Sequence, residues 1–349
     1  MSKQAYKFRL YPTRKQRECL QKTLDACRML YNAALTERRD AYNFHVRQHP
    51  GYYDADTRKA RSRALAINYY SQANQLPEIK DIREEYQDIH SQVLQDVLRR
   101  VQKAFDAFFR RMRNGEEPGY PRFQGKGRYD SFTYPQAGFP LTHDSRVCLS
   151  KIGSIKVKLH RAIKGTIKTC TIKREGDEWY IVLACEVESE PLEANTEAVG
   201  IDLGLLHFAT LSTGETIENP RFLRKAEQRL EHLQQVLSKK KRGSHRRRKA
   251  VKQVAKAHRK VANQRRDFLY KQSRELVNAY GTMVFEDLQP ANMSRRPNPK
   301  QDEHGKYLPN GAAAKGGLNK SIVDAGWGLF QQLCTYKAAL DRLQSCGTM

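Results

Sequence analysis

The sequence has no long apolar segment. None of its 349 residues belongs to a run of about 18 consecutive apolar side chains, the length that a membrane-spanning helix needs. The N-terminal segment Met1–Lys7 lacks the continuous apolar core of a secretory signal. These absences exclude a spanning membrane protein and lead us to expect a cytoplasmic protein without a membrane partner.

Paired cysteines are also missing. The seven cysteines stand at positions 19, 27, 148, 170, 185, 334 and 346, and no two have the C-x-x-C spacing from which structural zinc sites are built. We therefore expect no zinc and no structural metal. The scatter of the thiols suits reduced cysteines that are mostly buried.

Acidic residues are scarce relative to basic ones. The chain has 63 lysines and arginines against 38 aspartates and glutamates, which gives a formal net charge of +25. Such an excess points to a polyanionic partner, and nucleic acid is the favoured class. An anionic membrane surface is the weaker alternative.

Helical periodicity dominates the first third of the chain, after one short strand. Residues 1–12 alternate apolar and polar side chains up to Pro12, which predicts a half-buried strand. Thr13 followed by Gln16 has the pattern of a capping box, and we expect the helix that it opens to continue to about His45. A loop over 46–60, a helix over about 60–75 and a strongly amphipathic helix over Ser91–Arg113 complete this region.

The period changes at Gly119, and short alternating runs follow. The two runs that flank Glu175-Gly176-Asp177 predict a β-hairpin, because a glycine between polar residues suits a tight turn. We expect this small basic block to form a β-barrel that takes the N-terminal strand into itself. The expected strands are 131–134, 146–152, 154–159, 166–174 and 178–188.

A polar segment over 189–196 marks a predicted domain boundary, and a very basic region follows it. Residues 221–266 contain 18 lysines and arginines but only Glu227 and Glu231 as acids. Apolar residues at helical spacing predict a helical hairpin that turns near Gly243-Ser244. Self-repulsion is large at this charge density unless phosphates neutralise it, which favours a nucleic-acid surface over a solvated helix pair. Other expectations are a hairpin at Ser212–Gly214 between the first two strands of this domain, a third helix at Asp267–Ala279, a loop over 294–318 and a helix over Ser321–Leu343.

Two acids stand on predicted strands, one on each side of this basic region. Asp202 lies in the apolar run Ala198–Gly204, and Glu286 lies near the end of Met283–Leu288. A two-metal nuclease of RNase H/RuvC type needs this order, up to its third acid. The D-x-G pattern of Asp202 also occurs in actin-like ATPases, but that fold needs a second D-x-G loop downstream, which we do not find.

Several separated motifs, in order, give the chain a resemblance to a known family. They are Phe8–Pro12, Leu30–Asn32, Gly119–Phe123, Gly200–Gly204, His258–Phe268, Phe285–Leu288 with Asn292-Met293, and Ser321–Gly328. Together they cover nearly the whole sequence, which resembles TnpB, the RNA-guided nuclease family of bacterial insertion sequences related to type V CRISPR effectors.

The resemblance implies an α+β multidomain protein. Its expected parts are a wedge strand over 1–12, a helical recognition domain over 13–118, a wedge β-barrel over 119–190 and a RuvC/RNase H-like α/β domain over 191–349. The implied partners are a guide RNA and double-stranded DNA with a short adjacent motif, and the implied location is the bacterial nucleoid.

The sequence departs from the family after Tyr336–Leu340. Family members continue into a zinc ribbon and then supply a third carboxylate, and neither pattern is found before Met349. Asp324 belongs to a motif that members carry beside their third acid, and Asp341 has no strand context, so neither is expected to replace it. We therefore expect an incomplete, truncated RuvC domain in which Asp202 and Glu286 are vestigial and hold Mg²⁺ only weakly.

The main expectation from this departure is an RNA-guided DNA-binding protein without cleavage, which represses transcription by occupying its target and needs no cofactor to bind. One alternative is an active RNA-guided endonuclease whose C-terminal part is missing from this chain. A plain RNA-binding protein or an inert transposon remnant is the other.

Two groups of residues are expected to contact nucleic acid. The family's pattern maps DNA-motif recognition onto Tyr69, Gln95, Thr133 and Tyr134, whose side chains can contact base edges or methyl groups. The residues expected to contact the phosphate backbone are Lys239, Lys240, Lys241, Arg242, Arg246, Arg247, Arg248, Lys249, His258 and Arg265.

Overall fold

A computed structural model describes residues 2–43, 67–142, 144–187 and 195–342. The chain divides into two compact units, Met1–Glu188 and Ser189–Met349. The division falls at the start of the predicted polar linker.

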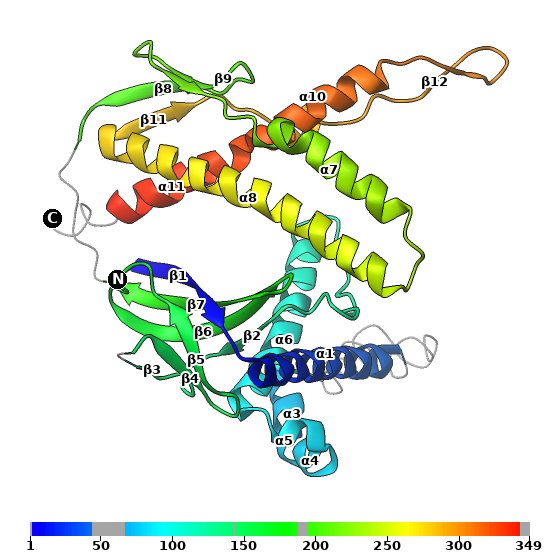
Figure 1. Ribbon diagram of the computed structural model, residues 1–349, viewed down its shortest axis with the longest axis vertical. Helices are drawn as coiled ribbons and strands as arrows, with labels where there is room; N and C mark the ends of the chain where they lie inside the picture. Colours follow the sequence, from blue (N-terminus) through cyan, green and yellow to red (C-terminus); the bar gives the residue numbers. More distant parts are fainter. Residues whose placement is uncertain (1, 44–66, 143, 188–194, 343–349) are drawn as a thin grey trace. The chain divides into compact units, whose positions relative to one another are not determined.

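The first unit is built on a curled seven-stranded sheet with the N-terminal strand near its centre (Figure 1). Strand β1 (Ser2–Tyr11) pairs antiparallel with β7 (Glu178–Val187) along its length and with β5 (Gly153–Lys158) at its end. The other strands are β2 (Ser131–Tyr134), β3 (Leu141–Thr142), β4 (Arg146–Leu149) and β6 (Thr166–Glu175). The order is β2-β6-β7-β1-β5-β4-β3. The predicted barrel is thus a half-barrel, because the end strands β2 and β3 do not pair with each other in the described part of the chain.

Buried apolar side chains alternate with outward-facing ones along these segments, which explains why they form a sheet with one face in the core. In β1, Tyr6, Phe8 and Leu10 are buried, and the intervening residues face away from the core. The hairpin between β6 and β7 turns at Gly176, whose φ of +65° lies in the left-handed region that glycine adopts without strain. The predicted β-hairpin is therefore confirmed.

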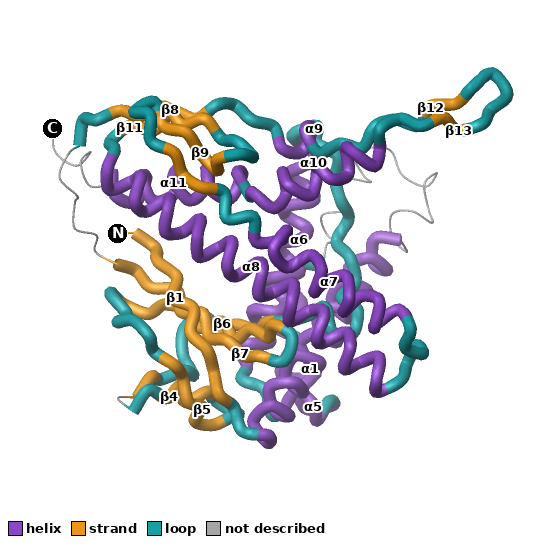
Figure 2. The backbone as a smooth tube through the Cα atoms, turned by 45° about the horizontal axis from the view of Figure 1, so that its top comes forward, coloured by secondary structure: helices purple, strands orange, loops and turns teal. Residues whose placement is uncertain are grey.

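Helices cover this sheet (Figures 1 and 2). Helix α1 (Arg14–Tyr42) begins with the predicted capping box, in which the Thr13 hydroxyl accepts from the Gln16 backbone and the Gln16 side chain accepts from the Thr13 backbone. Helix α6 (Ser91–Arg113) has the predicted bounds. Shorter helices are α3 (Tyr69–Asn74), α4 (Leu76–Ile82) and α5 (Glu84–Gln87). The loop predicted over 46–60 and the start of the helix from 60 lie outside the described residues.

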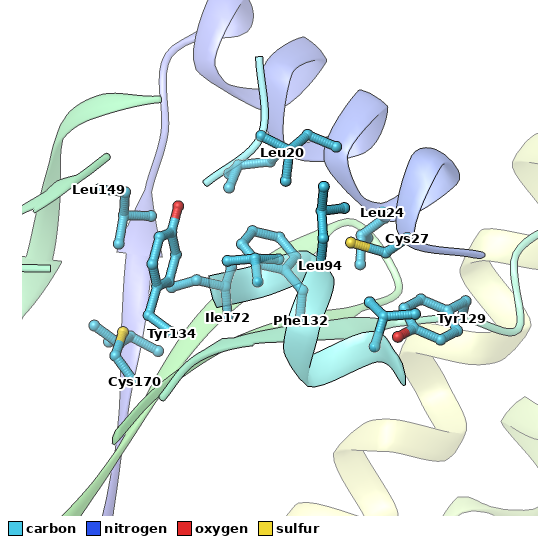
Figure 3. Close-up of a cluster of buried hydrophobic side chains, with 14 of the residues drawn as sticks. Leu20, Leu24, Cys27, Leu94, Tyr129, Phe132, Tyr134, Leu149, Cys170 and Ile172 are labelled. Carbon is cyan, nitrogen blue, oxygen red and sulfur yellow. The ribbon is translucent and has the colours of Figure 1, made fainter. Parts of the chain in front are cut away.

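The core of the first unit joins helices to strands (Figure 3). Leu20 and Leu24 of α1 and Leu94 of α6 are at most 1% exposed. They lie against Phe132 of β2, which is fully buried. Helix α6 buries one stripe of apolar residues, as its spacing predicts, and its arginines lie outside that stripe.

The second unit contains a four-stranded sheet in the order β10-β9-β8-β11. Its strands are β8 (Ala198–Asp202), β9 (His207–Leu211), β10 (Thr216–Glu218) and β11 (Thr282–Phe285). Strands β8 and β11 are parallel, and the other pairs are antiparallel. The turn at Ser212–Gly214 joins β9 to β10, so its predicted position between the first two strands of the sheet is wrong.

Two long helices connect β10 to β11. Helices α7 (Phe222–Ser238) and α8 (His245–Ala279) form the predicted hairpin, and Gly243 turns between them with a φ of +83°. A separate helix from Asp267 was predicted, but α8 is continuous to Ala279, because no glycine or proline interrupts it. Gly281 ends the connection at a close approach, since a Cβ there would lie 1.6 Å from the Asn195 carbonyl oxygen.

The C-terminal part is helical apart from one small hairpin. The elements are α9 (Pro290–Met293), β12 (Lys300–Gln301), β13 (Tyr307–Leu308), α10 (Ala312–Ala325) and α11 (Trp327–Arg342). The single helix predicted from Ser321 is therefore two helices, which break at Gly326 with a φ of +74°. Phe330 of α11 and Leu269 of α8 are fully buried and belong to the same core as Ile201. No helix in the described ranges has the length and apolar character to cross a bilayer.

Candidate functional site

The two predicted acids lie side by side at one edge of the second unit's sheet. In the parallel register Ile201 pairs with Phe285, so the residues that follow them, Asp202 and Glu286, are neighbours at the carboxyl ends of adjacent strands. Adjacent strands are about 4.8 Å apart. Ile201 and Phe285 belong to the core and its margin, whereas both acids are exposed. The sheet thus presents two carboxylates together.

The carboxylates of Asp202 and Glu286 form no ion pair that would stabilise the described part of the structure. Among the described residues neither Asp202 nor Glu286 forms an ion pair, although the Glu286 backbone carbonyl accepts from the Leu288 N–H at 2.9 Å and from the Gln331 amide at 3.4 Å. Carboxylate oxygens are the ligands that Mg²⁺ prefers. The pair therefore fits a divalent cation, although no group of three or more metal-ligating side chains is found in the described part of the chain.

Asp324 is fully engaged elsewhere. One of its carboxylate oxygens accepts from the Arg265 guanidinium at 2.5 Å, and the other accepts from the Leu223 backbone N–H at 2.9 Å. Its side chain is only 9% exposed. Because α7 has no side-chain cap of its own, the Asp324 carboxylate serves as its N-terminal cap. This engagement agrees with the expectation that Asp324 does not complete the acid pair.

Most of the predicted phosphate-contacting residues are exposed to solvent, but some form hydrogen bonds within the protein. Most of them are exposed at the α7–α8 turn or along α8: Lys239, Lys241, Arg242, Arg246, Arg248, Lys249 and His258. Lys240 is half-buried. Arg247 has a structural role, since its guanidinium donates to the Leu237 and Lys240 carbonyls at 3.1 and 3.0 Å and closes the turn.

Arg265 is engaged in an ion pair within the fold, and its predicted role as a phosphate contact stays a prediction. It pairs with Asp324, and its side chain is 23% exposed. Periodicity shows that the residue lies on a basic helix, but it cannot show that a carboxylate from α10 approaches the same side. Below we call the exposed cations Lys239, Lys241, Arg242, Arg246, Arg248 and Lys249 the basic tip.

The predicted motif-reading residues lie in different surroundings. Tyr69 at the start of α3 is half-buried, and the Arg99 guanidinium lies 5.2 Å from its ring centroid. Gln95 stands one turn before Arg99 on α6 and is half-buried. The structure therefore brings Tyr69 and Gln95 to one face, which is consistent with a joint role that stays a prediction.

Thr133 and Tyr134 are held by the fold. The Thr133 hydroxyl accepts from Arg100 at 2.8 Å and lies 2.9 Å from the Thr171 hydroxyl. Tyr134 is 1% exposed, and its hydroxyl donates to the Ser150 carbonyl at 3.0 Å. Burial raises the pKa of the Tyr134 phenol well above its ordinary value. In β2 the alternation that turns Phe132 inward also turns Tyr134 inward, so in this structure Tyr134 has no surface for a base.

Sequence reasoning missed the central role of Arg100. Its guanidinium bonds Asp96 at 2.9 Å and donates to the Ser131 carbonyl at 2.8 Å, in addition to its bond to Thr133. It thereby ties α6 to β2. Its position beside the apolar stripe of α6 was the available signal, since an arginine there is placed to reach a neighbouring strand.

The fold and the acid pair define a two-unit α+β protein with paired carboxylates at the ends of two parallel strands. Comparison with known families agrees with the motifs. Residues 182–296 match the family of OrfB of IS605, described as "Probable transposase", and residues 1–45 match the same family's "Helix-turn-helix domain". The described part of that N-terminal match is one strand and one long helix, β1 and α1.

Relatives match over almost the whole chain. "Putative RNA-guided DNA endonuclease InsQ" of Escherichia coli K12 is 30% identical over 337 residues, which is 96% of this chain and 77% of that protein. A "Putative RNA-guided DNA endonuclease" of Streptomyces pristinaespiralis is 30% identical over 343 residues, 97% of this chain and 75% of that protein. A chain of the "Cas12f1-sgRNA-target DNA complex" aligns over 94% of this chain and 72% of that chain, at 11% identity and a TM-score of 0.48.

The chain belongs to the TnpB family, in which the OrfB proteins of IS605-type insertion sequences are grouped. It spans about three quarters of the length of these two relatives.

Proposed function

We propose that this chain is an RNA-guided DNA-binding protein of TnpB type and that Asp202 and Glu286 are two carboxylates of its Mg²⁺-dependent DNA-cleaving site. The observation that carries the proposal is the parallel register of Ile201 with Phe285, which makes the two acids neighbours. The relatives are named as RNA-guided DNA endonucleases, which supports assigning the acids to cleavage.

A guide RNA and a DNA target are the proposed partners. The net charge of +25 and the exposed cations of the basic tip support a polyanionic ligand. Guide pairing would supply sequence recognition, and the protein would read only the short motif beside the target. Tyr69 and Gln95 are the proposed motif readers.

The carboxylate pair fits one Mg²⁺ ion, and a metal bound there would polarise a phosphate oxygen or activate a water molecule. Asp202 and Glu286 would hold it through oxygen ligands from adjacent strands. A second ion needs at least one more carboxylate, and Asp324 is bound to Arg265 and Leu223. Cleavage by this chain therefore requires a ligand other than the described side chains.

A second candidate function is target occupancy without cleavage, as in a transcriptional repressor. It is favoured by one observation: within the described ranges no third metal-ligating side chain joins the acid pair. In this case Asp202 and Glu286 would contribute nothing to DNA binding.

One experiment separates the two functions. The 349-residue chain is purified with its bound RNA, the RNA is sequenced, and a supercoiled plasmid is built with a matching target beside a randomised flank. Guide-dependent linear product that needs Mg²⁺ and disappears in Asp202→Ala supports cleavage.

Retarded but uncut plasmid, with equal binding by Asp202→Ala, supports occupancy. A plasmid without the matching sequence is the control. If neither binding nor cleavage depends on the match, both functions are wrong.

A further inference from the structure

A group of exposed large side chains, four aromatic and one methionine, lies in the first unit at the C-terminal ends of α1 and α6 and in the loop after α6. Tyr42, Phe109, Met112, Tyr120 and Phe123 are each between 45% and 57% exposed. Soluble proteins rarely expose this many large apolar side chains in one place unless the place binds something. We call these five residues the aromatic platform.

Ring contacts join two members of the platform, Phe109 and Tyr120, to the rings of Phe105 and Phe108 on α6. Phe108 lies edge-on to Phe109 at 5.2 Å and to Tyr120 at 5.4 Å. The buried Phe105 stacks with Phe109 at a centroid distance of 6.3 Å. The rings are therefore supported from beneath while their outer faces meet solvent.

The loop that carries Tyr120 and Phe123 is fixed to α1. The Asn32 side chain accepts from the Gln124 backbone N–H at 2.8 Å and donates to its carbonyl at 3.0 Å. Pro121 between the two aromatic residues is buried. Asn32 of the Leu30–Asn32 motif thus holds Gln124, the residue that follows the Gly119–Phe123 motif, and this fixes the loop against α1.

The surroundings of the platform are cationic. Residues 110–128 contain six lysines and arginines, all exposed, against two glutamates. The Arg39 guanidinium lies 5.2 Å from the Phe123 ring centroid. Exposed rings among arginines are the combination with which proteins bind unpaired nucleic acid, because rings stack on bases and cations meet phosphates.

We propose that the aromatic platform binds an unpaired stretch of RNA by stacking its bases on Phe109, Tyr120 and Phe123. The choice of RNA over DNA rests on the proposed function, since RNA loops and ends present unstacked bases without help, whereas duplex DNA does not. The platform residues belong to the first unit, whereas the basic tip belongs to the second and is proposed to contact phosphates, which does not require unpaired bases.

The test uses the full chain, freed of bound RNA by nuclease and high salt. Binding is measured by fluorescence anisotropy with labelled oligouridine of about 20 nucleotides, with oligothymidine of the same length and with an RNA duplex. We expect Phe109→Ala and Phe123→Ala each to weaken oligouridine binding by about tenfold, the loss expected for one stacked base. Duplex binding should stay unchanged, because paired bases offer no free face.

Two controls make the result specific to stacking. Tyr307→Ala removes a more exposed ring, 70% exposed, from β13 in the other unit, and should leave oligouridine binding unchanged. Phe109→Trp keeps a stacking face and should bind at least as well as the unaltered chain. Since no charge is removed, the salt dependence of binding should have the same slope in Phe109→Ala, whereas Arg122→Ala should reduce the slope by about 0.7.

Several outcomes would overturn the inference. They are unchanged oligouridine binding in both alanine variants, equal losses in Tyr307→Ala, or tighter binding of oligothymidine than oligouridine. A concentration-dependent dimer that Phe109→Ala abolishes would assign the platform to a second copy of the chain. Guide-dependent capture of a matched plasmid in the same preparations tests the proposed function separately, so that either idea can fail while the other stands.

Discussion

The role of Asp324 gives the sharpest test of how the second unit is built. Replacing Asp324 by alanine would leave the Arg265 guanidinium without its partner and the Leu223 N–H without its acceptor. Removing one partner of a buried ion pair costs about 3–5 kcal/mol, and loss of a helix cap adds about 1 kcal/mol. Arg265 is 23% exposed and can turn toward water, so we expect a total of about 3 kcal/mol.

The assay is thermal unfolding of the RNA-free chain in the absence of Mg²⁺, with both proteins scanned at the same rate. For a unit of this size, about 3 kcal/mol corresponds to a fall in the melting temperature of roughly 6–12 °C. Asp324→Asn keeps an oxygen that can accept from Leu223 and should cost about half as much. Arg265→Met removes the charge that Asp324 neutralises, and adding it to Asp324→Ala should restore part of the loss, because the uncompensated cation is then gone.

The competing role for Asp324 is that of a metal ligand. An Asp324→Ala protein that melts like the unaltered chain but no longer cleaves a matched target with Mg²⁺ would refute the structural role. A protein that melts early and still binds Mg²⁺ at Asp202 and Glu286 would uphold it.

Three further predictions concern the rest of the molecule. Lys239→Ala and Arg242→Ala should weaken RNA and DNA binding regardless of sequence, and each should reduce the slope of log K against log salt by about 0.7–0.9, a change that titrations at several salt concentrations can measure. Tyr69→Ala and Gln95→Ala should weaken binding of a duplex target by about 1–3 kcal/mol for each real base contact, but binding of a complementary single strand should hardly change. Equal losses of binding on both substrates would show that these residues do not read the motif. Burial raises the pKa of Cys27 from 9.0 to about 12, so its thiol stays protonated and unreactive in the folded chain near pH 8. The stability that this protonated thiol supplies below pH 9 is lost as the pH rises toward 12. Rapid labelling of Cys27 by iodoacetamide, matching that of the exposed Cys19, would contradict this burial.

Local sequence patterns predicted secondary structure correctly where the residues that determine it lie close together in the chain. The capping box at Thr13, the stripe of α6 and the turn at Gly176 depend on residues within a few positions of one another. The adjacency of Asp202 and Glu286 required one more step, the pairing of two strands that are separated by the helical hairpin. The resemblance to the family supplied that step, and the register of Ile201 with Phe285 agrees with it.

Sequence patterns could not show the contacts that a distant residue makes with a side chain. Arg265 resembles its basic neighbours along α8, but Asp324 of α10 reaches it and no local pattern contains that contact. Tyr134 and Thr133 alternate as strand residues should, but the choice of the inward face depends on how α6 covers β2 through Arg100. The aromatic platform was missed because Phe108 and Phe109 continue the apolar stripe of α6, and such a stripe ordinarily packs into a core.

The continuity of α8 restricts how this protein can change in length. The helix rises about 1.5 Å per residue, so its 35 residues hold the tip cations roughly 50 Å from the residue that precedes β11. Each inserted residue would turn the tip by about 100° relative to the sheet, whereas seven residues make nearly two full turns. Helix α7 lies along α8 and must match any change. Variants of this hairpin should therefore tolerate paired insertions or deletions of about seven residues in both helices. Single-residue changes should point the basic tip away from its proposed nucleic-acid ligand.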